Sequence, residues 1–440
     1  MKIQIKNKLI SLIIAKVSKV VEKSNVFIHL MDSNQFVSLH RRKNLRFVVV
    51  SDIHIAPNKC LEKRKLKNVF STMYNLDSNM DAIAIVGDLT DGGSEKEYNA
   101  FKRILDKNKK EETILIASMG NHEQNTPSKF SSVTGRNPRE NITINGYHFI
   151  TVSPRLSEDT YGGSRYNLDE IWMKEQLEHA ILEDGDKPIF VFIHHGIKNT
   201  AYGTDQWYTE DFEKIFNNYP QVIQFSGHSH YPLNNPKSIY QKAFTSINTS
   251  TTSYFELETG MMYGTIPPKA NRACQMMVIE VAGAAVQIRK LDLSSGEYIG
   301  KDWIINTAEG KNKFKYVESR AQKSIAPYFE ENAKVIINKI KSDSCVVTLN
   351  QAKVNDRADE WLDDIVHSYK FDFIDKKTGE IFDSFKVWSE FYILPREDCL
   401  VQQFNQLKAD TDYVIVVMAY NAYGKVSTNQ VRSSFKTKHL

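Results

Sequence analysis

Five short strings rich in carboxylate, amide and imidazole side chains stand between residues 52 and 230. They are Asp52-Ile53-His54, Gly87-Asp88-Leu89-Thr90-Asp91, Gly120-Asn121-His122-Glu123, His194-His195-Gly196 and Gly227-His228-Ser229-His230. Six of the chain's twelve histidines fall inside these strings. Oxygen and imidazole ligands suit zinc, manganese or iron, and none of the strings contains a thiolate. The strings therefore predict a metal centre, and two ions fit so many ligands better than one.

The spacing within the strings indicates how the ligands share two ions. Asp52 and His54 lie two residues apart, so both can point at one ion, and His228 and His230 have the same spacing. Asp88 is central in the order and is the natural bridging carboxylate. Two cations about 3.5–4 Å apart can generate a hydroxide and stabilise both oxygens of an in-line displacement at phosphorus. The ligand set therefore predicts hydrolysis of a phosphate ester.

Two further residues of the strings fit proton transfer. A departing alkoxide needs a proton, and His122 beside the metals can supply it as general acid. Asp91, three residues after Asp88, could keep His122 charged and oriented. A single histidine after a strand is more often a packed core residue, so this assignment depends on the whole set of strings.

Apolar runs before the strings predict the elements that position them. The clearest runs are 47–50, 82–86, 114–117 and 189–193, with a weaker one at 222–225. Helical patterns at 61–76, 95–105 and 167–182 alternate with these runs, as in βαβ units with a mainly parallel sheet. The carboxyl ends of neighbouring parallel strands meet at one edge of a sheet, so the strings should converge there. Antiparallel strands at 276–281 and 286–291 follow, and we expect two packed sheets with helices outside them.

The ordered set of strings resembles the motif series of the calcineurin-like metallophosphoesterases, DxH, GDxxD, GNH[DE], a strand-end H and GHxH. The resemblance covers about residues 45 to 305. It implies a four-layer α-β-β-α sandwich, an α/β fold, with two divalent metal ions. It also implies two ligand sets: Asp52, His54, Asp88 and His230 for one ion, and Asp88, Asn121, His194 and His228 for the other. His194 is chosen because it directly follows its strand; His195 then faces the outer shell or the substrate, and exchange of the two stays open.

Departures from subfamily patterns narrow the expected substrate. Purple acid phosphatases have a tyrosine ligand where Asp91 stands here, and protein Ser/Thr phosphatases have an arginine where this chain has Gly92. The layout is more similar to bacterial phosphodiesterases that act on cyclic nucleotides or glycerophosphodiesters. Arg165, Tyr202 and Trp207 are candidate substrate contacts, with loop packing as the alternative role. The partner we expect is a small phosphate ester.

Changes of pattern along the chain predict four segments. They are a basic N-terminal segment at 1–44, a catalytic domain at 45–306, a linker at 307–332 and a β domain at 333–440. Short strands with period-two patterning predict a β-sandwich in the last segment. Leu407 and Tyr413 resemble the tyrosine corner of a fibronectin type III domain, which implies a scaffold or a module that binds protein or carbohydrate.

Bulk properties exclude several classes. At 440 residues the chain is long enough for two domains, and a net charge of +4 does not favour nucleic acid as a partner. The apolar run at 9–15 is too short to span a bilayer and is interrupted as a signal peptide, which favours a cytoplasmic or surface-associated protein. The run at 9–15 fits a helix packed on the domain or, alternatively, a basic helix on a membrane surface. The four cysteines lack CxxC spacing and are expected to be buried free thiols.

Two other functions remain open from the sequence. The first is a binding or adhesion protein whose phosphoesterase domain is degenerate, although the ligand set is intact. The second is a nuclease of the same superfamily, although no cluster of basic and aromatic residues stands near the strings.

Overall fold

The computed structural model describes residues 44–155, 165–356 and 361–439. The predicted N-terminal helix lies outside these residues. None of the described helices is long and apolar enough to cross a membrane.

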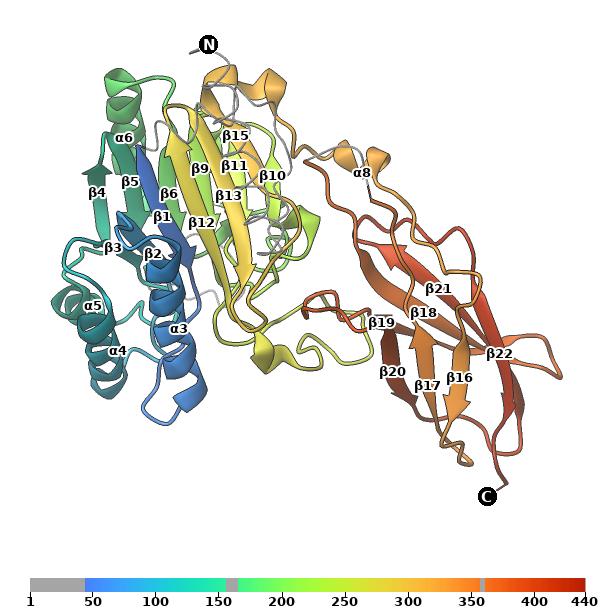
Figure 1. Ribbon diagram of the computed structural model, residues 1–440. Coiled ribbons are helices and arrows are strands. Elements are labelled where there is room, and N and C mark those ends of the chain that lie inside the picture. The colour runs from blue at the N-terminus through green and yellow to red at the C-terminus, as the bar shows by residue number, and fades with distance from the viewer. Residues whose placement is uncertain (1–43, 156–164, 357–360, 440) are drawn as a thin grey trace, which may run out of the picture. The chain divides into compact units, whose positions relative to one another are not determined.

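Two mixed β-sheets form the first part of the described chain (Figure 1). The first sheet has the order β14-β13-β12-β1-β2-β3, with β15 paired to β13. Its strands are β1 (Leu45–Val50), β2 (Ala82–Val86), β3 (Ile114–Ser118), β12 (Gln275–Ala282), β13 (Ala285–Asp292), β14 (Glu297–Tyr298) and β15 (Trp303–Asn306). Strand β1 is parallel to β2 and antiparallel to β12, so the chain returns late to complete the sheet it began.

The second sheet has the order β10-β11-β9-β6-β5-β4. Its strands are β4 (Arg139–Ile144), β5 (Tyr147–Val152), β6 (Ile189–Ile193), β9 (Val222–Ser226), β10 (Ile239–Gln241) and β11 (Thr245–Asn248). Strands β5, β6, β9 and β11 are parallel, and β4 and β10 are antiparallel edge strands. Two short strands, β7 (Gly196–Ile197) and β8 (Tyr208–Thr209), pair separately.

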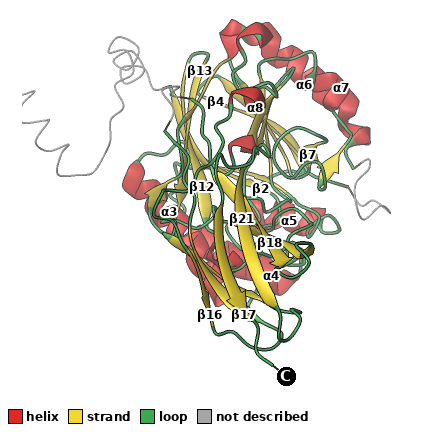
Figure 2. Ribbon diagram, turned by 90° about the vertical axis from the view of Figure 1, so that its right-hand side faces the viewer, coloured by secondary structure: helices red, strands yellow, loops and turns green. Residues whose placement is uncertain are grey.

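Helices cover the outer faces of both sheets (Figure 2). They are α3 (Cys60–Leu76), α4 (Glu95–Asn108), α5 (Pro127–Thr134), α6 (Glu170–Glu183) and the short α7 (Glu213–Phe216). Side chains of α3, α4 and α5 share a core with the first sheet, and those of α6 and α7 share one with the second. A third core lies between the sheets and contains Phe47, Phe149, Phe190 and Phe225. The predicted four-layer α-β-β-α sandwich is therefore confirmed.

Burial on both faces explains why the strands of the first sheet have continuous apolar runs. In β1, Phe47 and Val49 point into the core between the sheets, whereas Val48 and Val50 point toward the helices. Local signals begin the helices: Ser94 and Glu97 form a capping box in which each side chain accepts the other residue's backbone N–H. The expected helix at 95–105 accordingly begins at Glu95, and it continues to Asn108.

The last part of the described chain is an all-β sandwich of two antiparallel sheets. One has the order β16-β17-β20 and the other β19-β18-β21-β22. The strands are β16 (Val335–Asn338), β17 (Cys345–Asn350), β18 (Val366–Asp375), β19 (Ile381–Trp388), β20 (Cys399–Phe404), β21 (Asp412–Asn421) and β22 (Val431–Lys436). The Tyr413 hydroxyl accepts the backbone N–H of Lys408 at 3.0 Å, as a tyrosine corner requires. The expected fibronectin type III-like sandwich is confirmed. The short helix α8 (Arg320–Lys323) precedes it.

Some elements were not expected from the sequence. The β4–β5 hairpin, α5 and the edge pair β10–β11 carry weak periodic signals because they are short and partly polar. All four cysteines are free, and Cys274 and Cys345 are buried as expected. The prediction of burial was wrong for Cys60, because this residue begins α3 on the exposed side of the helix, and Cys399 is only partly buried.

Candidate metal centre

All five strings begin within two residues of the end of a strand in the two central sheets. Asp52 and His54 follow β1, Asp88 follows β2, and Asn121 follows β3 in the first sheet. In the second sheet His194 follows β6, and His228 and His230 follow β9. Because each predicted ligand follows a strand, side chains between residues 52 and 230 meet at one edge of the sandwich.

The backbone at this edge takes conformations that few residues other than glycine adopt. Five of the predicted ligands have a positive φ, between 49° and 67°: Asp52, His54, Asp88, His228 and His230. Such strained residues cluster at functional sites, where the surrounding structure must enforce them. Two glycines make room for the ligands: a Cβ at Gly120 would collide with the Asp88 carboxylate, and one at Gly227 with that of Asp52. The glycines of the strings thus have a steric role.

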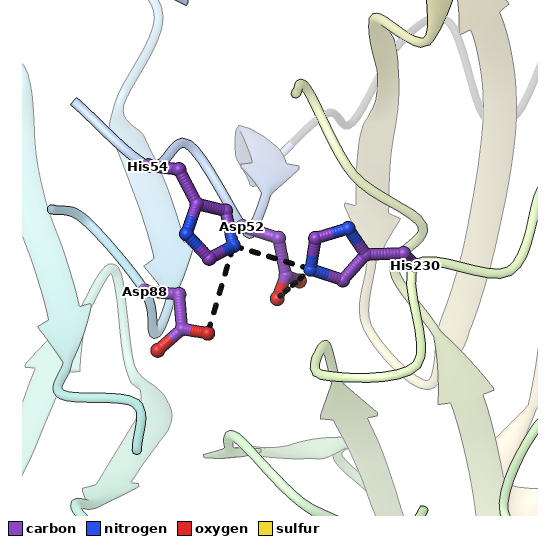
Figure 3. A group of neighbouring side chains, drawn as sticks. All are labelled: Asp52, His54, Asp88 and His230. Carbon is purple, nitrogen blue, oxygen red and sulfur yellow. Dashed lines mark hydrogen bonds and ion pairs between the residues drawn. The ribbon is translucent and has the colours of Figure 1, made fainter. Parts of the chain in front are cut away.

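Four side chains form the first possible metal site (Figure 3): Asp52, His54, Asp88 and His230. The Nε2 atoms of His54 and His230 lie 3.2 Å apart. His230 Nε2 lies 3.2 Å from Asp52 Oδ1, and His54 Nε2 lies 3.7 Å from Asp88 Oδ2. All four are buried. Imidazole nitrogens and carboxylate oxygens that converge on one point are a donor set that fits a divalent cation.

A second group shares Asp88 with the first and adds His194 and His228. His194 Nε2 lies 3.2 Å from Asp88 Oδ2 and 3.1 Å from the amide oxygen of Asn121. The structure therefore brings together all seven residues that the sequence predicted as ligands, with Asp88 between the two groups. Of the two adjacent histidines, His194 belongs to this group of possible ligands.

Backbone carbonyls orient two of the imidazoles. The Nδ1–H of His194 donates to the carbonyl of Val86 at 2.9 Å, and that of His230 donates to the carbonyl of Tyr254 at 2.9 Å. These bonds leave Nε2 of each ring directed at the carboxylates, which is the orientation that histidine ligands usually have. Tyr254, which sequence reasoning missed, has this role through its backbone, so its side chain gave no signal.

The buried carboxylates of the site are stabilised by positive charge nearby. Burial alone would raise the pKa of Asp88, but the neighbouring His194, His54 and His122 hold it well below its usual value. Burial opposes protonation of His194, yet the Asp88 carboxylate raises the pKa of this imidazole to about 9. Two buried carboxylates, Asp52 and Asp88, thus attract protons onto neighbouring histidines. Divalent cations can supply the same charge more effectively, so the residues fit metal ions.

His122 lies at the open side of the centre. Its side chain is 36% exposed, and its Nε2 lies 3.8 Å from Asp88 Oδ2. The expected contact with the Asp91 carboxylate is not the one observed: His122 Nδ1–H donates to the backbone carbonyl of Asp91 at 2.6 Å. The carboxylate instead bonds Lys59 at 2.5 Å and lies 3.5 Å from His54 Nδ1. His54 and Lys59 accordingly lower the pKa of Asp91.

His195 is buried beside the second group, with its ring centroid 4.3 Å from that of His228. Its backbone N–H donates to the Tyr166 hydroxyl at 3.2 Å, and that hydroxyl donates to His195 Nδ1 at 2.8 Å. Burial and the neighbouring His228 lower the pKa of His195 well below its usual value, because both disfavour the charged ring. The buried Nε2 of His195 has no hydrogen-bond partner among the described residues.

The remaining substrate candidates lie in loops near the strings. Arg165 is buried, and its guanidinium donates to Gln124 Oε1 at 3.4 Å, just after the third string. The ring of Trp207 packs edge-on against that of His228, with 5.2 Å between the ring centroids. Tyr202 points elsewhere: its hydroxyl donates to Glu258 at 2.5 Å.

Glu123 is a further residue whose role the sequence did not reveal. It is fully buried, and its carboxylate accepts the N–H and the hydroxyl of Thr90, both at 2.7 Å, and the N–H of Gly120 at 3.0 Å. Glu123 thereby joins the loops after β2 and β3, which carry Asp88 and Asn121. The only signal was its acidic position at the end of the third string.

Comparison with known proteins agrees with this geometry. The family model described as calcineurin-like phosphoesterase matches residues 45–232, a span that includes all five strings. A probable glycerophosphodiester phosphodiesterase, GpdQ, of Arcobacter nitrofigilis is 28% identical over 202 residues, which are 42% of this chain and 71% of the relative.

Among solved structures, purple acid phosphatase PPD1 from yellow lupin (Lupinus luteus) seeds is 12% identical, with a TM-score of 0.44. The match covers 60% of this chain and about half, 53%, of that protein. The fn3 domain of the human collagen alpha-1(XX) chain is 17% identical over 27% of this chain and 89% of that domain, with a TM-score of 0.18.

Residues 45–232, which lie in the first domain, therefore match the calcineurin-like phosphoesterase family. The protein is a hydrolase of phosphoric esters that combines this domain with a fibronectin type III-like sandwich.

Proposed function

We propose that the protein is a dinuclear phosphodiesterase that acts on small diesters of the glycerophosphodiester or cyclic nucleotide type. The observation that carries the proposal is the position of Asp88, which belongs to both groups of possible metal ligands. One ion would be held by Asp52, His54, Asp88 and His230, and the other by Asp88, Asn121, His194 and His228. Manganese, iron and zinc all suit these donors.

Two divalent ions supply positive charge to the phosphate oxygens and a nucleophile from water at neutral pH. The residues of the chain supply the proton for the leaving group and orient its donor. His122 stands at the open side of the centre, where its Nε2 can give a proton to the departing alkoxide. The Asp91 carbonyl holds the opposite nitrogen of this ring and so keeps Nε2 directed at the centre.

His195 and Arg165 are the substrate-binding residues that we propose. The network through Tyr166 leaves His195 Nε2–H as an unused donor beside His228, where a phosphate oxygen can accept it. A guanidinium matches the geometry and charge of a phosphate, and Arg165 is tied to the loop after the third string. Support for a glycerophosphodiester comes from the Arcobacter relative, whose name states that activity.

A substrate panel tests the proposal. The purified chain, loaded in turn with manganese, iron(II) and zinc, is assayed with bis-p-nitrophenyl phosphate, cyclic nucleotides, glycerophosphodiesters and nucleoside monophosphates. We expect turnover of small diesters that is lost on chelation and restored by metal. Monoester turnover alone would contradict diester specificity, and salt-sensitive cleavage of DNA would favour a nuclease.

The assignment of the second metal set has its own test. His194→Ala should lose metal and activity, whereas His195→Ala should keep both ions and raise KM. If His195→Ala loses an ion and His194→Ala does not, the two histidines exchange roles. A binding or adhesion protein with a degenerate domain would show neither metal uptake nor turnover.

A further inference from the structure

A second cluster of histidine and carboxylate side chains lies outside the catalytic centre. His148 belongs to β5, whereas His179 and Glu183 stand one turn apart on α6. One ligand atom from each of the three lies within 4.8 Å of the others. We propose that these residues form an independent binding site for a borderline divalent ion such as Zn²⁺, which joins α6 to the second sheet.

The topology separates this cluster from the catalytic centre. His148 is the second residue of β5, which is parallel to β6. The catalytic ligand His194 follows the carboxyl end of β6, so the two histidines stand at opposite ends of the sheet. The His148 side chain faces α6, because Ile150 and Val152 of the same strand pack with that helix.

One ligand atom from each residue lies within 4.8 Å of the other two, which allows a single ion to have three protein ligands. His148 Nε2 lies 3.1 Å from Glu183 Oε2, and His179 Nδ1 lies 3.4 Å from Glu183 Oε1. Bonds of about 2.0–2.1 Å in a tetrahedral site place neighbouring ligand atoms about 3.3 Å apart. Two imidazoles and one carboxylate leave a fourth position for water. The half-exposed side chains of His179 and Glu183 give the ion access from solvent.

Outer hydrogen bonds already orient the buried ligand. Asn141 donates its amide N–H to Gln176 Oε1 at 3.1 Å, so its own oxygen faces His148 Nδ1, also at 3.1 Å. When Nδ1–H of His148 donates to this oxygen, Nε2 can either offer its lone pair to a metal ion or carry a proton to the Glu183 carboxylate. The outer-shell amide is the kind of partner that metal-binding histidines have.

Metal counting separates these two cases. The variant Asp88→Asn serves as the background, because it removes the shared ligand of the catalytic centre. Zinc bound to the full chain is measured by equilibrium dialysis and elemental analysis. We expect one zinc per chain in Asp88→Asn, with at least a tenfold weaker affinity in Asp88→Asn/His179→Ala. Glu178→Gln on the same helix is the matched control, because it removes an exposed carboxylate that pairs with Lys174 but is not in the cluster.

A thermal readout is independent of activity. Zinc should raise the Tm of Asp88→Asn and of its Glu178→Gln derivative, but not that of the His179→Ala derivative. In the otherwise wild-type chain, His179→Ala should leave phosphodiesterase activity unchanged, so failure here and failure of the proposed function are distinguishable. Equal zinc content and equal Tm shifts with and without His179 would overturn the site and identify an ion pair of protonated His148.

Discussion

The carboxylate of Asp88 lies 3.2 Å from Nε2 of His194, although the two residues are 106 positions apart in the sequence and belong to different sheets. This contact joins the carboxyl edges of the two sheets across the sandwich. Neither sheet by itself carries a complete ligand set, because His194, His228 and His230 come from the second sheet and the other ligands from the first. The packing of sheet on sheet therefore brings the predicted metal ligands together.

Replacing Asp88 by Asn should abolish metal binding at the catalytic centre, and activity with it. The change removes a negative charge from both ligand groups at nearly constant volume, and we expect kcat to fall by at least about 100-fold. Elemental analysis and turnover of bis-p-nitrophenyl phosphate measure the two effects. Asp106→Asn, an exposed carboxylate paired with Lys102, is the control. Retention of two ions by Asp88→Asn would contradict a shared ligand.

Replacing His122 by Ala should leave metal content intact and slow the chemical step. General acid catalysis contributes about 10²- to 10⁴-fold, and the loss should be largest for alkyl leaving groups, which need the proton most. Turnover of a glycerophosphodiester and of a p-nitrophenyl ester is compared in both proteins. Full speed of His122→Ala on the alkyl ester would remove His122 as the acid.

The buried lysine Lys290 should make stability depend on pH in the alkaline range. Burial lowers its pKa from 10.5 to about 8, although its ammonium donates to the Lys301 carbonyl at 2.6 Å. Between pH 8 and 10.5 the unfolded chain holds a proton that the folded protein has released, so the free energy of unfolding rises with pH there. This contribution is absent below pH 8.

Comparison with Lys290→Met isolates that effect from other titrating groups. Urea unfolding of both proteins is measured at pH 7.5, 9 and 10.5. Over this range the free energy of unfolding of the wild type should rise by on the order of 1–3 kcal/mol relative to that of the variant. Parallel pH profiles of the two proteins would show that Lys290 does not titrate in this window.

The four free cysteines should react with a thiol reagent at very different rates. Cys60 is exposed, whereas burial raises the pKa of both Cys274 and Cys345 to about 12 and suppresses the reactive thiolate. In the native protein we expect rapid labelling of Cys60 and protection of Cys274 and Cys345 until denaturant is added. Peptide mapping after short labelling measures this order, and early labelling of Cys274 would contradict the packing under α3.

Replacing Tyr413 by Phe should destabilise the C-terminal sandwich without affecting catalysis. The change removes the hydroxyl that accepts the Lys408 N–H and should cost about 1 kcal/mol. Tyr420→Phe on the same strand is the control. Urea unfolding and phosphodiesterase assays report the two properties separately, and an unchanged midpoint for Tyr413→Phe would show that the corner bond adds no net stability.

Much of the fold was accessible from local patterns. Strands of the two central sheets are buried on both faces, so they stand out as apolar runs, and each run is followed at once by its polar string. Helices such as α4 carry capping signals. The short edge strands β4 and β10 escaped prediction because half-polar segments of three to six residues resemble loops.

The sequence alone determined which residue types could bind metal and the order of strand and ligand, because both are local properties of the chain. It could not decide between His194 and His195, the partner of His122 or the role of Glu123. Those depend on backbone angles and on contacts between loops from different strands, such as the Asp91 carbonyl that meets the ring of His122. The cluster of His148, His179 and Glu183 was likewise decided only by the packing of α6 on β5, since 31 residues separate the first ligand from the second.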